Sequence, residues 1–194
     1  MDTPETVRLL GNALSLDFAN SVDWSAEDEP IKDDVLAVPD DLRRWGIRLG
    51  LGDTARRPTR GEFALALELR KAVHRAFAAI GMGDDPPVGT LRTIAGHHAE
   101  AASAARLESA DSGAYRLSWA ATDPRRIRYA VATDAVGLLA DPERVRRIRH
   151  CPGRDCGWVF LDLSGRRRWC SMDTCGSRAK MRRLYERQRR AAAA

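Results

Sequence analysis

Through residues 1–140, most hydrophobic positions recur with the spacing of an α-helix. The segment 62–80 shows this best, and the glycines at 81 and 83 end it. Further helices are expected from Pro39 to about residue 49, over 90–110 and from residue 123 to about 139, followed by a short basic helix over 144–149. The residues that fall on one face of segment 62–80 are Phe63, Leu67, Arg70, His74 and Phe77.

Two stretches of this region show other patterns. In residues 7–22, Leu14, Leu16 and Phe18 alternate as in a strand, whereas Leu14 and Phe18 also fit a helical period, so both types remain open. Residues 115–119 alternate and are expected to form a strand of a small sheet. The pattern therefore predicts a mainly α domain, residues 1–140, with a small β-strand element.

Residues 141–194 have a different character and are expected to form an appended module. Residues 158–162 are typical of a strand, Ser164-Gly165 of a turn and residues 166–169 of a return strand. A helix is expected after Gly176, with Ser177 as its N-cap. A knuckle, a β-hairpin and a helix in this order are the layout of a treble-clef-like zinc module.

The four cysteines of the chain all lie in this module. Four residues separate the partners of each pair and thirteen separate the pairs, a spacing that suits a tetrahedral thiolate site for one structural zinc ion. The alternatives are reduced core cysteines, a disulfide, or His150 in place of one ligand. A site closed by four protein ligands leaves no open position for catalysis, and no nucleophile motif or phosphate loop is evident, so we do not expect an enzyme. The expected ligands are Cys151, Cys156, Cys170 and Cys175.

Charge is distributed unevenly along the chain. The net charge is +5, but residues 141–194 hold 15 basic and six acidic residues, which leaves residues 1–140 slightly acidic. A basic module on an acidic body indicates an anionic partner, most often nucleic acid, although a merely solvated arginine-rich helix is the alternative. A hydrophobic content of 44% allows a real core. No apolar run long enough for a membrane span and no signal-peptide pattern is evident, so a cytoplasmic location is expected.

The motifs Cys156-Gly157-Trp158, residues 168–172 and residues 175–180 together resemble the CGNR zinc finger. Ser177 stands where that family has Asn, and both residues are good N-caps. Residues 14–21 are similar to the opening motif of the ABATE domain, which is commonly joined to this finger. The resemblance implies a bacterial, stress-induced transcription regulator whose finger binds DNA and whose helical domain senses an effector.

Several functions are compatible with the sequence. The leading hypothesis is a DNA-binding regulator, with RNA as a variant because Trp158 and Trp169 either shield the zinc or stack on unpaired bases. The alternative is a zinc-stapled protein-interaction module. Asp17, Asn20 and Arg70 are the candidates for an effector pocket, and a homodimer is left open. The expected nucleic-acid contacts are Arg166, Arg167, Arg168, Arg178, Lys180, Arg182, Arg183 and Arg187.

Overall fold

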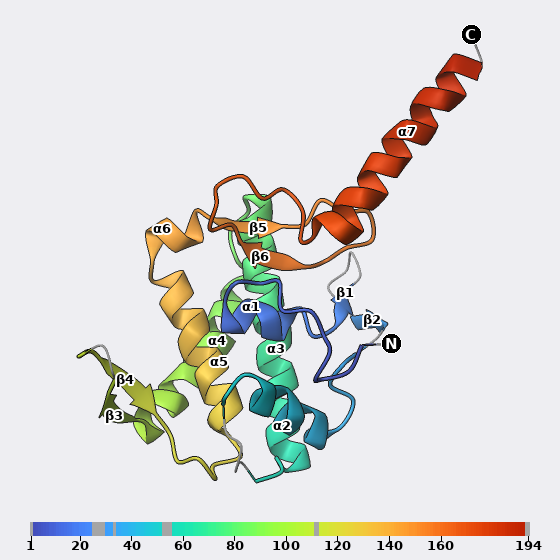
Figure 1. Cartoon of the computed structure of the whole chain (residues 1–194). Helices are drawn as coiled ribbons and strands as arrows, with labels where there is room; N and C mark the ends of the chain where they lie inside the picture. The colour runs from blue at the N-terminus through green and yellow to red at the C-terminus, as the bar shows by residue number, and fades with distance from the viewer. Residues whose placement is uncertain (1, 25–29, 33, 52–55, 111–112, 193–194) are drawn as a thin grey trace.

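The computed structural model describes residues 2–24, 30–32, 34–51, 56–110 and 113–192. It is mainly helical, as predicted, and its strands form three two-stranded antiparallel sheets (Figure 1). The helices are α1 (Leu14–Ala19), α2 (Pro39–Arg48), α3 (Arg60–Met82), α4 (Val88–Ala104), α5 (Arg126–Leu139), α6 (Pro142–Val145) and α7 (Ser177–Ala192). The sheets pair β1 (Asp23–Trp24) with β2 (Pro30–Lys32), β3 (Arg106–Ser109) with β4 (Tyr115–Ser118), and β5 (Ile148–His150) with β6 (Val159–Leu161).

Helix α3 runs through the middle of the helical body. It begins where the Thr59 hydroxyl accepts a hydrogen bond from the Glu62 amide at 3.1 Å, and it ends at Gly83, whose φ of 92° favours glycine. Its buried face contributes Leu69, Val73 and Phe77 to a core that α1 and α5 also line. Burial of these apolar side chains is the main driving force for the packing of the bundle.

Three stretches differ from the sequence-based expectation. The open question over residues 7–22 is settled as a helix, α1, whose first turn is held by the Asp134 carboxylate. The helix expected over 90–110 ends at Ala104, because residues 106–109 pair with residues 115–118 as a β-ribbon. The prediction of a short basic helix over 144–149 is wrong for its second half, because residues 148–150 form β5 and pair with β6.

The prediction that residues 158–162 pair with residues 166–169 in a hairpin is also wrong. Strand β6 pairs with β5, in the register Ile148↔Leu161 and His150↔Val159. Residues 166–169 form no ladder, because the Asp162 carboxylate instead accepts hydrogen bonds from the Ser164 and Arg167 amides at 3.0 and 3.1 Å. The hairpin that does form, β5–β6, therefore encloses the first cysteine pair in its loop.

This hairpin shares the hydrophobic core of the helical body. Ile148, Val159 and Leu161 are buried in the same cluster as the α3 and α5 side chains. A Cβ atom at Gly81 of α3 would overlap the backbone of His150, so glycine is needed for this close approach. The division at residue 140 stays a prediction, but the structure places β5 and β6 against α1 and α3.

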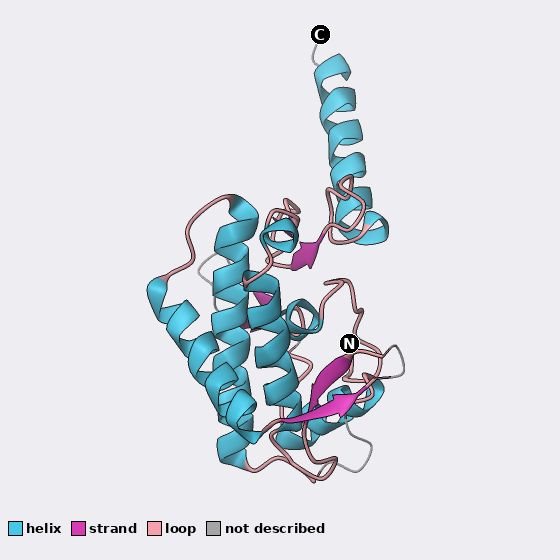
Figure 2. Ribbon diagram, turned by 90° about the vertical axis from the view of Figure 1, so that its left-hand side faces the viewer, coloured by secondary structure: helices cyan, strands magenta, loops and turns pink. Residues whose placement is uncertain are grey.

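Helix α7, in contrast, extends away from the rest of the molecule (Figures 1 and 2). Of its residues only Ala179 is buried. A turn of π-helix, Met172–Gly176, leads into it and is capped by the Ser171 hydroxyl, which accepts from the Asp173 amide at 3.2 Å. The expected cap, Ser177, is instead the first residue of α7, and its hydroxyl donates to the Met172 carbonyl.

Candidate metal centre and basic surface

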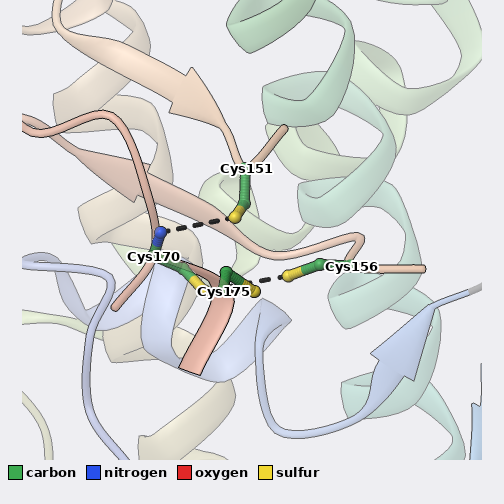
Figure 3. A group of neighbouring side chains, drawn as sticks. All are labelled: Cys151, Cys156, Cys170 and Cys175. Atoms are coloured by element: carbon green, nitrogen blue, oxygen red, sulfur yellow. Dashed lines mark hydrogen bonds between the residues drawn. The ribbon is translucent and has the colours of Figure 1, made fainter. Parts of the chain in front are cut away.

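Four cysteine side chains converge between the β5–β6 loop and the start of α7 (Figure 3). Their sulfur atoms all lie within 4.8 Å of one another, and His150 is not part of this group. The Sγ–Sγ distance is 3.7 Å from Cys156 to Cys170 and 3.6 Å from Cys170 to Cys175. These separations are far longer than the roughly 2.05 Å of a disulfide.

The cluster fits a tetrahedral zinc site. With Zn–S bonds of about 2.3 Å, tetrahedral sulfurs are separated by about 3.8 Å, close to the two distances above. The ionisation of the thiols points the same way. Hydrogen bonds from Cys156 and Cys170 lower the pKa of Cys151, whereas hydrogen bonding to Cys151 raises the pKa of Cys170. One thiolate therefore disfavours ionisation of the neighbouring thiols. A bound divalent cation would allow all four to ionise, and its ligands would be Cys151, Cys156, Cys170 and Cys175.

Backbone geometry places the first pair of cysteines. The Cys151 amide donates to the Trp158 carbonyl at 2.9 Å, which closes the loop that carries Cys156. A Cβ atom at Gly153 would lie 2.8 Å from the Cys175 sulfur, so only glycine lets the loop approach this closely. The Cys170 amide points at the Cys151 sulfur at 3.4 Å, as expected for a metal-bound thiolate.

Aromatic rings and one arginine surround the sulfurs. Phe160 is fully buried against the cluster, and the half-buried Trp158 and Trp169 pack on it. The Arg167 guanidinium lies over the Phe160 ring, 4.2 Å from its centroid. It donates to the carbonyls of Leu10 at 2.8 Å, of Trp169 at 3.1 Å, and of Cys170. Arg167 therefore ties the finger to the N-terminal segment and is occupied within the fold.

The other predicted nucleic-acid contacts lie on the surface of the finger. Arg166 and Arg168 are exposed in the loop before Cys170, and the remaining candidates are exposed along α7: Arg178, Lys180, Arg182, Arg183 and Arg187. Sequence reasoning missed Arg154, which lines a cleft of about 240 Å³ together with Arg178 and Arg182, beside Cys175. Its position in the loop between the first two cysteines was the available signal.

The three effector candidates do not form one pocket. Asn20 is buried between α1 and β6, where its Nδ2 donates to the Val159 carbonyl at 2.8 Å and its Oδ1 accepts from the Val159 amide at 3.0 Å. The Asp17 carboxylate accepts from the Gly11 amide at 2.7 Å, and burial raises its pKa to about 6. Both residues therefore join segments of the fold.

Arg70 is the candidate that lines a cavity. Its guanidinium forms two hydrogen bonds with the Asp34 carboxylate, at 2.6 and 2.8 Å, and one with the Ser21 hydroxyl. It borders a cavity of about 690 Å³ between α3 and the start of α4, which Trp24 and Thr90 also line. Arg70 therefore borders the cavity with its charge already paired to Asp34.

Two further polar groups were not anticipated as joints of the fold. Arg128 is buried and pairs with Glu62 at 2.7 Å and with Glu100 at 2.8 Å, which joins α3, α4 and α5. His74 Nε2 lies 2.7 Å from the Gly157 carbonyl, so this imidazole donates to the loop that carries Cys156. The helical position of His74 on a buried face was a signal for such a role.

In the part of the chain that the structure describes, no helix has the length and apolarity needed to cross a membrane.

Comparison with protein families gives two matches. Residues 12–142 match the ABATE model, described as "Putative stress-induced transcription regulator". Residues 147–188 match the model of the CGNR zinc finger, as the motifs around the cysteines indicate. None of the curated proteins compared with the chain matches it.

Proposed function

We propose, since the chain belongs to the ABATE family and carries a CGNR zinc finger, that it regulates transcription by binding DNA through that finger. The finger supplies the contact surface, and the helical body holds the finger in place. Family membership supports the regulatory role, and the basic surface of the finger supports the contact with DNA.

The observation that carries the proposal is the free-standing helix α7. Its 16 residues give a length of about 24 Å at 1.5 Å per residue, and a helix of this width enters the major groove of DNA. Arginine guanidinium groups form paired hydrogen bonds with phosphates and with guanine edges. Within the described residues, Arg178, Arg182 and Arg183 have no acidic partner, so their charges are available to DNA.

The metal centre places these charges next to a cleft. Arg154 comes from the loop of the first cysteine pair, whereas Arg178 and Arg182 come from the first turns of α7. The cleft borders Cys175, so the same cluster that closes the finger sets the spacing of the three guanidinium groups. A bound zinc ion would hold both segments together. Asp155 also lines the cleft, 3.8 Å from the Arg154 guanidinium, so Arg178 and Arg182 supply the charge that suits a backbone phosphate.

The role of the metal centre and the cellular location of the protein follow from the cysteines. We assign the four-sulfur centre a structural and not a catalytic role, because the four sulfurs would fill all four positions of a tetrahedral ion. Reduced cysteines at metal spacing suit a reducing compartment, so a cytoplasmic location is part of the proposal.

A salt titration with the zinc-loaded full chain tests DNA binding. Sites would first be selected from random duplex DNA, and their affinity measured by fluorescence anisotropy between 50 and 200 mM salt. We expect a steep fall of affinity with salt, and Arg182→Ala to reduce the slope of log K against log salt by about 1. Arg92→Ala, which removes an exposed arginine of α4, is the matched control and should leave the slope unchanged. A flat salt dependence would refute the proposal, and single-stranded RNA in parallel decides between the nucleic acids.

One observation favours a second candidate, a protein-interaction module. Met181, Leu184 and Tyr185 share one face of α7 and are 50%, 42% and 63% exposed. An apolar stripe flanked by arginines also suits the groove of an acidic protein. If Leu184→Ser and Tyr185→Ser leave all nucleic-acid binding unchanged but abolish capture of a protein partner, the interaction module becomes the better assignment.

A further inference from the structure

The β3–β4 ribbon presents its polar face to the body of the protein. In its register Arg106 pairs with Ser118 and Glu108 with Arg116, so these four side chains share one face. The other face carries Leu107 and Tyr115, which are 71% and 73% exposed. A ribbon that covers a hydrophobic core has the opposite arrangement, with its apolar face inward.

The inward face of the ribbon lines a cavity of about 710 Å³. Its other walls are the loop after β4, one side of α5, and Gly50 and Leu51 after α2. A volume of this size lies in the range of pockets for small molecules, roughly 300–1,000 Å³. The cavity is separate from the metal centre and from the cavity that Arg70 borders.

Three arginines outnumber the two carboxylates, Glu108 and Asp134, in the lining of this cavity. Arg106 and Arg116 come from the two strands and Arg126 from the first turn of α5. Within the described residues, neither Arg106 nor Arg126 has an acidic or hydrogen-bonding partner, although Arg126 is half-buried. Only Arg116 has one, Glu108, at 3.9 Å. Three guanidinium groups against two carboxylates leave the lining with a net positive charge, which favours an anion, and Arg126 is partly withdrawn from water.

The remaining lining groups suit an organic molecule. The Trp119 ring contributes an apolar wall, and its indole N–H is occupied by the Ala101 carbonyl at 2.9 Å. Hydroxyl groups of Ser118 and Thr133 add donors and acceptors. The Asp134 carboxylate accepts hydrogen bonds from the Ser15 amide and hydroxyl at 2.8 and 2.6 Å, so one of its oxygens is already engaged within the fold.

We infer that this cavity binds a small organic anion whose phosphate or carboxylate groups are held by Arg106, Arg116 and Arg126. As a binding site it stands on its own geometry, and as an effector site it rests on the proposed regulatory function. Helix α1 connects the cavity to the finger. Asp134 accepts a hydrogen bond from the first turn of α1, and Asn20 at the other end of α1 is hydrogen-bonded to β6. An anion that changes the position of Asp134 therefore acts on the strand behind the metal centre.

Isothermal titration of the zinc-loaded full chain tests the inference, with citrate as the carboxylate probe and pyrophosphate as the phosphate probe. We expect one of the two to bind with one site per chain, and Arg126→Gln to weaken that binding at least tenfold. Arg187→Gln on α7 is the control, because pyrophosphate attracted by the basic helix alone would respond to this change instead. Arg106→Gln, on the exposed ribbon, repeats the test if Arg126→Gln does not fold. The zinc content is measured before and after, because both probes chelate metal ions.

The outcomes separate this inference from the proposed function. Equal affinity in wild type and Arg126→Gln, loss of binding in Arg187→Gln only, or no binding of either probe at millimolar concentration would each overturn it. DNA anisotropy on the same proteins is the second readout. If Arg126→Gln loses the anion and keeps DNA affinity without the anion, both stand. If no DNA binds but citrate or pyrophosphate does, the site stands and the regulatory function fails.

Discussion

The hydrogen bonds of Asn20 give the sharpest prediction about how the finger is held. Asn20→Ala removes both bonds to Val159 and leaves a buried amide N–H and a buried carbonyl of β6 without partners. An orphaned buried polar group costs about 1–3 kcal/mol, so the loss is about 2–6 kcal/mol. Since small domains have a free energy of unfolding of about 5–15 kcal/mol, this is a large fraction of the total. Urea unfolding of the zinc-loaded protein, followed by circular dichroism, measures it.

Asn12 supplies the matched control. Its Nδ2 also donates to β6, to the Leu161 carbonyl at 2.9 Å, but Asn12 is exposed and has a φ of 59°. Asn12→Gly deletes that single bond and fits the left-handed backbone, so we expect a loss within about 1 kcal/mol. If Asn20→Ala costs no more than Asn12→Gly, water or backbone movement satisfies β6 and the reasoning is refuted.

Three further predictions concern the metal centre and its surroundings. Cys170→Ser should abolish the one zinc ion per chain found by metal analysis and lower the melting temperature, and a zinc content equal to wild type would contradict the site. Arg167→Ala should reduce the free energy of unfolding by about 2–3 kcal/mol, since three carbonyls lose a charged donor, whereas Arg168→Ala should change it little. Burial raises the pKa of Asp17 to about 6, above its ordinary value of 3.8, so the folded state holds a proton that the unfolded chain releases. Stability from this group is therefore lost as the pH rises from about 4 to about 6, and urea unfolding across this range should show that Asp17→Asn removes the loss.

The metal ligands could be predicted from the sequence because their information is local. Four cysteines at regular spacing imply convergence whatever the rest of the chain does, and the structure brings the four sulfurs together. The helices were also predictable where apolar side chains repeat over several turns, as in α3. Boundaries failed where strand pairing decides, as at residues 106–109, whose composition also permits a helix but which pair with residues 115–118.

Roles of single polar side chains were harder to predict, because a sequence does not show what lies opposite. Asn20 and Asp17 were candidates for an effector pocket with local capping as the alternative, and they bond to the backbones of Val159 and Gly11. Arg167 resembled its neighbours in a run of three arginines, yet it alone turns inward over Phe160. The strand pairing of β6 was missed for the same reason, since its partner lies before the first cysteine and not after it.

Helix α7 is exposed whereas the β5–β6 hairpin is buried against the body, and this difference bears on how such a chain diverges in evolution. Substitutions on α7 meet almost no other residues, so they cost little folding free energy, and new binding preferences can accumulate there one at a time. The hairpin has no such freedom, because Ile148, Val159 and Leu161 complete a core built by other helices. A chimera that moves this finger to a foreign body would expose that apolar face. We therefore expect finger and body to be inherited together, with variation concentrated in α7.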